Sequence, residues 1–156
     1  MKTNLITNFF AQNNKGNNLN IKVVLEGKLK ESFYLEGAKE YQKRLLNRVE
    51  IVEVNNIEEY LKNKQNAFLI TMEIEGKQLS SPDFAKKLRE IETDGYYNEI
   101  LFLIGGAEGL VQNVRNKSNF KFSMSKLTFL HQEAVLVLME QIYRAYKILN
   151  NEPYHK

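Results

Sequence analysis

The stretch that most constrains the fold is an apolar run that ends in two glycines. Residues 99–106 read EILFLIGG, and only the first of them is charged. A strand this continuously apolar is typical of a parallel sheet covered on both faces, because water then meets neither face. The glycines end the strand and allow the backbone to approach a ligand or turn sharply. The run therefore predicts a central strand of an α/β sheet.

Strand-like and helix-like segments alternate along the rest of the chain. β-Branched and apolar runs predict further strands at 21–25, 49–54, 67–74 and 120–124. Apolar residues at helical spacing predict helices at about 29–45, 57–64 and 131–149, with a short helix after the glycine turn. Ser81 before Pro82 marks the start of another helix. This alternation indicates the α/β class, with a mainly parallel sheet and helices on both faces.

Composition limits the chemistry. The 156 residues are 43% hydrophobic and 26% charged, which is typical of one soluble globular domain. There is no cysteine and there are only two histidines, so we expect no disulfide, no thiolate zinc site and no metal. The net charge of +3 permits a polyanionic partner without requiring one. No run reaches the roughly 20 apolar residues that span a bilayer, so we expect no membrane segment. The lack of cysteine fits a reducing cytoplasm, and we expect a cytoplasmic protein.

The first twenty residues differ from the rest. Seven of them are asparagine, and polar residues interrupt every apolar stretch that could serve as the core of a signal peptide. Such a composition buries too little apolar surface to order itself. We therefore predict an Asn-rich extension at 1–20, flexible in solution, followed by a single domain at 21–156.

Ligands of parallel α/β sheets bind beyond the carboxyl ends of the strands. Three predicted strand ends are candidates: residues 71–73, 104–109 and 124–129. A dinucleotide fingerprint beginning at Gly105 would need glycine at 107 and 110, but the chain has Ala107 and Leu110 there. A dinucleotide site is thus disfavoured. The two glycines alone are also consistent with a simple strand-to-helix turn.

The last 34 residues hold both histidines and close with Pro153, Tyr154, His155 and Lys156. Most chain ends fray, and this one could do the same. The alternative is a tail that folds back over a pocket and presents its phenol and imidazole there. Residue types alone leave the two readings open.

Several motifs resemble those of a known family. They are FLIGGAEGL, SMSKLTF followed by HQ, EQIYRA and the terminal EPYHK, with VVLEGKLKESF and EIEGKQLSS nearer the start. Together they resemble the small bacterial SPOUT-class methyltransferases that methylate N3 of a pseudouridine in 23S ribosomal RNA, over residues 21–156. The resemblance implies a C-terminal trefoil knot, an S-adenosylmethionine pocket within it, and a homodimer whose two subunits complete the active site. It also implies 23S rRNA within the ribosome as the partner.

Carried over by position, the resemblance assigns eight residues to the cofactor. They are Met72, Gly105, Met124, Ser125, Lys126, Leu127, Thr128 and Phe129. Glycine turns free backbone groups for hydrogen bonding, and the methionine, leucine and phenylalanine side chains supply apolar walls, as expected for a cofactor cleft. Leu127 and Phe129 could equally be ordinary core residues.

The resemblance assigns catalysis to Arg144, Tyr154 and His155. Tyr154 and His155 are expected around the target base, with His155 as the preferred general base because a tail can move onto a docked nucleotide. Arg144 is expected on RNA phosphate or on the developing enolate, or in a plain helix-surface ion pair. Glu140 could accept the proton or pair with Arg144 four residues later. His131 is expected to be structural.

The chain departs from the family pattern in three places. Leu130 replaces a proline, Val135 replaces an arginine that could contact RNA or cofactor, and the segment 55–65 is shorter. Two alternatives therefore stay open: a catalytically weakened RNA- or ribosome-binding relative, and a SPOUT methyltransferase that acts on a different RNA. For a homodimer, the expected contact is the apolar face of the last helix, although an ordinary core helix would show the same residues. They are Val137, Leu138, Ile142 and Tyr146.

Overall fold

A computed structural model describes residues 19–155. The described elements are β1 (Asn20–Glu26), α2 (Ser32–Arg44), β2 (Val49–Val54), α3 (Ile57–Leu61), β3 (Ala67–Gln78), α4 (Ser81–Thr93), β4 (Glu99–Ile104), α5 (Gln112–Asn116), β5 (Phe120–Ser123) and α6 (His131–Leu149). Most of the predicted extension lies outside this range. Its last residues do not, since β1 begins at Asn20 and Leu19 is buried.

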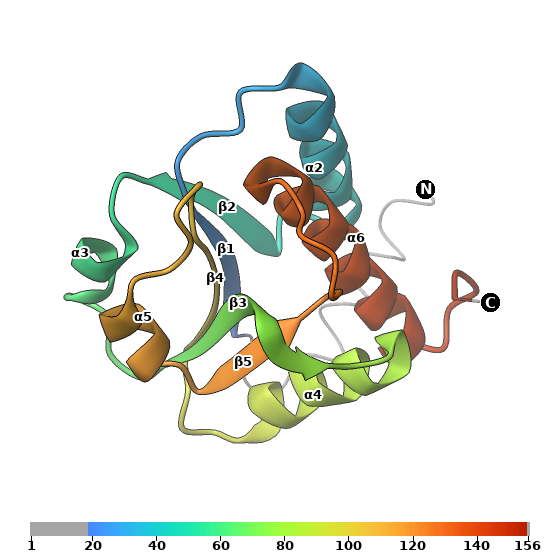
Figure 1. Ribbon diagram of the computed structural model, residues 1–156. Helices are drawn as coiled ribbons and strands as arrows, with labels where there is room; N and C mark the ends of the chain where they lie inside the picture. Colours follow the sequence, from blue (N-terminus) through green and yellow to red (C-terminus); the bar gives the residue numbers. More distant parts are fainter. Residues whose placement is uncertain (1–18, 156) are drawn as a thin grey trace.

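The strands form one five-stranded sheet with the order β2-β1-β4-β3-β5, and all neighbouring strands are parallel. The central strand is β4, and Figure 1 shows helices on either side of the sheet. The predicted α/β class with a parallel sheet is confirmed. Among the described helices, none is long and apolar enough to cross a membrane.

The strand β4 is buried on both faces, as its sequence predicts. Ile100 and Phe102 point into the larger core, which also contains the buried sides of α2, α4 and α6. Leu101 and Leu103 point to the other face and pack with residues of α3 and α5. All six residues of β4 are buried. The continuous apolar run therefore reflects two separate layers of helices over one strand.

The strand β3 is longer than its apolar pattern suggests, because it contains a bulge. Met72 and Lys77 both pair with Phe122 of β5, so residues 73–76 loop out between them. Gly76 lies so close to β5 that a Cβ there would be 2.8 Å from backbone atoms of Lys121 and Phe122. The bulge is thus held tightly against the neighbouring strand, and it places residues 73–75 beside the end of the sheet.

The helix α6 is the main support of the larger core. Val135, Leu138 and Ile142 are fully buried along its inner face. Near its end the hydroxyl of Tyr146 donates to the buried carboxylate of Glu92, which also accepts from Arg48 Nη2 at 2.7 Å. These contacts tie α6 to α4 and to the start of β2. The helix therefore connects the carboxyl end of the sheet, where it begins, with the chain terminus, where it ends.

Candidate active site

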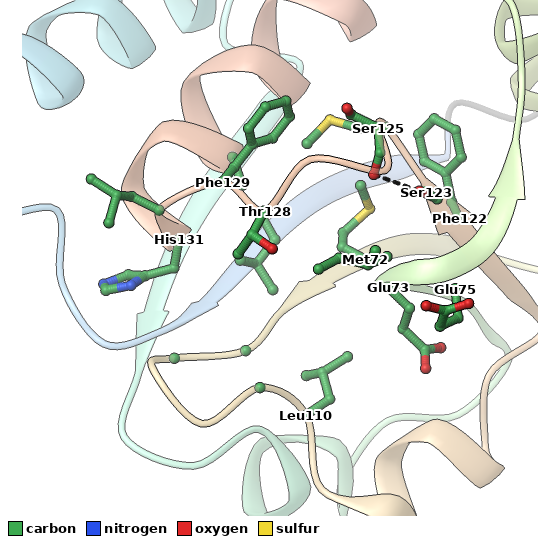
Figure 2. A pocket seen from close by; sticks show the side chains of 18 of the residues that line it. Met72, Glu73, Glu75, Leu110, Phe122, Ser123, Ser125, Thr128, Phe129 and His131 are labelled. Carbon is green, nitrogen blue, oxygen red and sulfur yellow. Dashed lines mark hydrogen bonds between the residues drawn. The ribbon is translucent and has the colours of Figure 1, made fainter.

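A cavity of ≈ 770 Å³ opens at the carboxyl ends of β3, β4 and β5. Its walls are the β3 bulge, the loop 104–110 after β4, the loop 122–130 after β5 and the first turn of α6. Figure 2 shows Met72 and Thr128 on facing sides of this space, with Leu110 below and His131 at one end. The position agrees with the rule for parallel sheets, since all three predicted strand ends meet at one place.

Seven of the eight residues that the resemblance assigns to a cofactor line this cavity. They are Met72, Gly105, Met124, Ser125, Leu127, Thr128 and Phe129. Lys126 is not among the lining residues. The set comes from β3, where its bulge begins, and from the loops after β4 and β5, so the fold itself brings it together. That these residues bind a cofactor stays a prediction.

The loop after β5 is held by its own serines. Ser123 Oγ donates to the carbonyl of Ser125 at 2.9 Å, and the amide of Leu127 donates to Ser125 Oγ at 3.0 Å. With the backbone fixed in this way, the side chain of Leu127 is 72% exposed and lies in the cavity wall, so it is not a core residue. Phe129 lines the cavity and also packs against the larger core.

The glycines of the loop after β4 are required by close backbone approach. A Cβ on Gly105 would lie 2.5 Å from the carbonyl carbon of Gly109 and 2.7 Å from the amide of Leu110. The amide of Gly109 donates to the carbonyl of Gly106 at 2.9 Å, and Gly109 has φ +74. The segment is therefore a tight turn, and that turn forms a wall of the cavity. Close approach of its backbone to a ligand stays a prediction.

Several lining residues were not assigned by the sequence. Glu73 and Glu75 come from the β3 bulge, Arg115 comes from α5, and His131 begins α6. Glu73 directly follows Met72 at a predicted strand end, so its position could have been found from the strand pattern. No pattern indicated Arg115, because a short polar helix gives no sign of which residue faces a cavity.

The three predicted catalytic residues form a second cluster, at the other end of α6. Arg144 Nε and Nη2 donate to Glu140 Oε1 at 3.1 and 2.7 Å, and Arg144 Nη1 lies 3.3 Å from His155 Nδ1. The guanidinium carbon of Arg144 is 4.7 Å from the ring centroid of Tyr154, whose hydroxyl donates to Glu140 Oε1 at 3.0 Å. The tail therefore folds back onto α6. Of the two roles expected for Glu140, the structure shows the pairing with Arg144.

We call Glu140, Arg144, Tyr154 and His155 the tail cluster, and its contacts bear on which of its atoms carry hydrogen. The hydrogen bonds from Arg144 to Glu140 raise the pKa of the guanidinium, which stays charged. Burial raises the pKa of Tyr154 to about 12, helped by its bonds to Tyr41 and Glu140, so the phenol keeps its proton near neutral pH. Since an arginine N–H can only donate, this contact requires His155 Nδ1 as the acceptor, which fits the tautomer with its hydrogen on Nε2. His155 can act as a base through Nδ1 only when the contact with Arg144 opens.

The tail cluster and the cavity lie far apart within one chain. His131 borders the cavity and Arg144 lies 13 residues further along α6. At the α-helical rise this is about 20 Å along the helix axis. Figure 1 shows the C-terminus at the end of α6 that points away from its first turn.

The structure also answers two secondary expectations. Leu138, Ile142 and Tyr146 were candidates for a dimer contact, but they are 0%, 0% and 6% exposed and pack inside the protomer core, so only Val137 of that set is still available. Val135 is fully buried as well, and it does not line the cavity. The valine therefore acts in core packing. Within residues 19–155, no group of acidic or histidine side chains is arranged to hold a metal ion.

The carboxyl ends of the strands are where parallel α/β sheets characteristically bind small molecules, and the cavity lies there. Solved structures agree on the fold. A probable methylase family protein from Haemophilus influenzae matches 89% of this chain and 71% of its own, with TM-score 0.55 and 14% identity. The SpoU methyltransferase AviRb from Streptomyces viridochromogenes, in complex with AdoMet, matches 83% of this chain and 58% of its own, with TM-score 0.51 and 11% identity.

The sequence identifies the family. Residues 19–155 match the family model described as "Predicted SPOUT methyltransferase". The proteins named ribosomal RNA large subunit methyltransferase H from Dictyoglomus thermophilum and Desulforamulus reducens are each 39% identical, over 88% of this chain and 99% of their own lengths. The chain belongs to the SPOUT methyltransferase family, whose methyl donor is S-adenosylmethionine.

Proposed function

We propose that this protein is an S-adenosylmethionine-dependent methyltransferase that methylates N3 of a pseudouridine in 23S rRNA of the assembled ribosome. The observation that carries the proposal is the near full-length similarity to proteins named for methylation of large-subunit ribosomal RNA. The choice of pseudouridine N3 rests on the motifs SMSKLTF, EQIYRA and EPYHK, which the chain shares with that class of enzyme. A ribosomal substrate also implies a cytoplasmic protein.

The cavity has the size and lining that a nucleoside cofactor needs. Its volume of ≈ 770 Å³ lies within the range for small-molecule sites, about 300–1,000 Å³. Met72, Leu127 and Phe129 would provide apolar walls, and the backbone of Gly105 and of the loop after β5 would provide polar contacts. When bound, S-adenosylmethionine supplies a methyl group on a positively charged sulfur, a good leaving group.

The tail cluster would hold the target base. Arg144, fixed by two bonds to Glu140, presents the rest of its guanidinium to negative charge on phosphate or on the base. Tyr154 stays a neutral phenol, so it can position the base but not deprotonate it. His155 carries a donor on Nε2 in the resting state, and docking of the base would have to release Nδ1 from Arg144 before that atom could take the N3 proton.

The distance between cavity and tail cluster supports a homodimer. About 20 Å along α6 separates them, which is too far for one chain to present both to the same reacting atoms. A two-fold dimer would place the tail cluster of one protomer over the cavity of its partner. Because most of the apolar face of α6 is already buried, we place the contact at exposed apolar residues near the cavity mouth, Leu127 and Leu130, which are 72% and 65% exposed.

Aromatic rings and cations interleave around the tail, as expected for a surface that binds RNA. Tyr143 lies 4.9 Å from Tyr154 between ring centroids, in an edge-to-face arrangement. Arg44 and Lys147 lie over the ring of Tyr143 at 5.9 and 5.3 Å. These charges lie beside the residues proposed to hold the target base, so phosphate contacts and base positioning would share one surface.

The test is methyl transfer from labelled S-adenosylmethionine to defined ribosomes. We expect label in 23S rRNA of 70S ribosomes that contain pseudouridine, and none when the target position is uridine. Binding of the cofactor without transfer to any ribosome would favour the weakened relative. Transfer to another RNA, with 70S ribosomes unlabelled under conditions where a known family member labels them, would favour the different substrate. Either result would overturn the proposal.

A further inference from the structure

The β3 bulge brings a carboxylate into the cavity. Residues 73–76 loop out between Met72 and Lys77, and the close approach of Gly76 to β5 fixes where they lie. Figure 2 shows the side chains of Glu73 and Glu75 below Met72. The side chain of Glu73 is only 12% exposed, whereas Glu75 is exposed. Of the two, Glu73 is therefore the carboxylate that the fold takes out of water.

The contacts of Glu73 leave its charge only partly compensated. The hydroxyl of Thr71, which is fully buried, donates to Glu73 Oε2 at 2.6 Å, and that hydroxyl also lies 2.6 Å from Ser118 Oγ. The other oxygen, Oε1, is 3.5 Å from Arg115 Nε, and this buried nitrogen has no hydrogen-bond partner. A carboxylate that is largely removed from water and has its nearest cation at 3.5 Å is costly in free energy, and a positively charged ligand nearby would reduce that cost.

The cavity as a whole also favours a cation. Its lining contains three carboxylates, Glu73, Glu75 and Glu108, and one guanidinium, Arg115. With histidine neutral this is a net charge of −2, in a chain whose overall formal charge is +3. The excess of negative charge is thus local to the cavity. It would attract a ligand with a positive charge, most strongly at Glu73, because Glu75 and Glu108 are exposed and water screens their charges.

We propose that Glu73 is a specificity-determining residue that makes the cavity prefer the positively charged methyl donor over its neutral demethylated product. The inference rests on the proposed function, because it takes S-adenosylmethionine as the ligand. The donor carries a sulfonium, and the product, S-adenosylhomocysteine, has an uncharged thioether at the same place. A carboxylate near that sulfur distinguishes the two, and the product is then released more readily.

Three ligands distinguish recognition of the positive charge from recognition of the rest of the cofactor: S-adenosylmethionine, sinefungin and S-adenosylhomocysteine. Sinefungin carries an amine in place of the sulfonium methyl group, so it is cationic there, while all three ligands share the adenosine and the α-amino acid. Binding is measured by isothermal titration calorimetry with the full chain. We expect Glu73→Gln to weaken S-adenosylmethionine and sinefungin by about tenfold, ~1.4 kcal/mol, and to change S-adenosylhomocysteine by less than about twofold.

Glu75→Gln is the matched control, since it removes the same charge from the same bulge at an exposed position. We expect it to weaken the two cationic ligands by no more than about threefold, clearly less than Glu73→Gln does, because water screens an exposed charge. Glu73→Asp keeps the charge, and we expect it to keep the preference for the cationic ligands. Thermal unfolding shows that each variant is folded before titration.

Three outcomes would overturn the assignment. Equal weakening of all three ligands by Glu73→Gln would place the carboxylate on a shared group such as the α-amino group. Unchanged affinities would show that Glu73 does not contact the ligand, and an equal effect of Glu75→Gln would show a diffuse field. If the wild-type protein bound none of the three ligands, the proposed function itself would fail, which is a different result from a failure of Glu73 alone.

Discussion

Replacement of Glu140 by glutamine tests how the tail cluster is held. One carboxylate oxygen of Glu140 accepts two bonds from Arg144 and one from Tyr154. Glutamine has the same length, but its uncharged oxygen accepts these donors less strongly. Its amide group would replace the other carboxylate oxygen, which accepts from Gln141 Nε2 at 2.8 Å, and so would bring two donors together there. The side chains of Glu140 and Arg144 are 19% and 25% exposed, so water screens the pair only in part.

The expected loss follows from these bonds. A hydrogen bond to a charged group contributes about 1.5–3 kcal/mol. Losing the charge but keeping one acceptor should weaken the interactions that position Arg144 and Tyr154 by about 2–3 kcal/mol. This corresponds to a fall in kcat/KM of about 30- to 150-fold. The affinity for S-adenosylmethionine should not change, since Glu140 does not line the cavity.

The assay measures methyl transfer to ribosomes, with cofactor binding by calorimetry and folding by thermal denaturation. Glu90→Gln is the control, because Glu90 is an exposed carboxylate on α4. We expect its kcat/KM to stay within about twofold of wild type, as for most exposed substitutions. A folded Glu140→Gln protein with kcat/KM within about threefold of wild type would refute the positioning role, as would a parallel loss of cofactor affinity.

Three further predictions follow from the geometry. Gly76→Ala should destabilise the protein by about 1–3 kcal/mol, because its Cβ would press on the β5 backbone. For a chain of this size the melting temperature should fall by about 2–12 °C. An unchanged melting temperature would contradict the close approach of the bulge to β5. Phe129→Ala should weaken S-adenosylmethionine binding by about tenfold while Lys126→Ala leaves it unchanged, since of these two residues only Phe129 lines the cavity. Calorimetry that shows the reverse order would contradict the assignment. The pKa of Tyr154 is raised to about 12, so this phenol adds stability that is fully present below pH 10 and is lost as the pH rises through 12. In urea titrations Tyr154→Phe should therefore show a smaller fall of the unfolding free energy between pH 10 and pH 12 than wild type. An unchanged fall would contradict the raised pKa.

The fold was largely predictable because it depends on apolar periodicity. Residues 99–104 had to be covered on both faces, and the structure covers them with α2, α4 and α6 on one side and α3 and α5 on the other. The bulge in β3 was not predictable, because it depends on how Met72 and Lys77 pair with another strand. Periodicity reads one segment at a time and is insensitive to such pairing.

The candidate site was predictable in its loops but not in its charges. The ends of β3, β4 and β5 meet because parallel strands end at one edge of the sheet, so Met72, Gly105 and Thr128 could be brought together from sequence. Arg115 and Glu73 could not be paired in advance, because their contact depends on how α5 lies against the bulge. The inner face of α6 was ambiguous for the same reason, since apolar residues there fit a core and a dimer contact equally well.

Mixing two inactive variants tests whether two protomers share one active site. Arg144→Ala should disable the tail cluster, and Thr128→Trp should fill the cavity from an exposed position. In a homodimer that combines the tail of one protomer with the cavity of its partner, a mixed dimer has one intact site out of two. Random reassociation makes half of the dimers mixed. About one quarter of the wild-type methylation of pseudouridine in 23S rRNA should therefore return. Each variant alone should stay inactive. No recovery, from variants shown to exchange subunits, would contradict a shared active site.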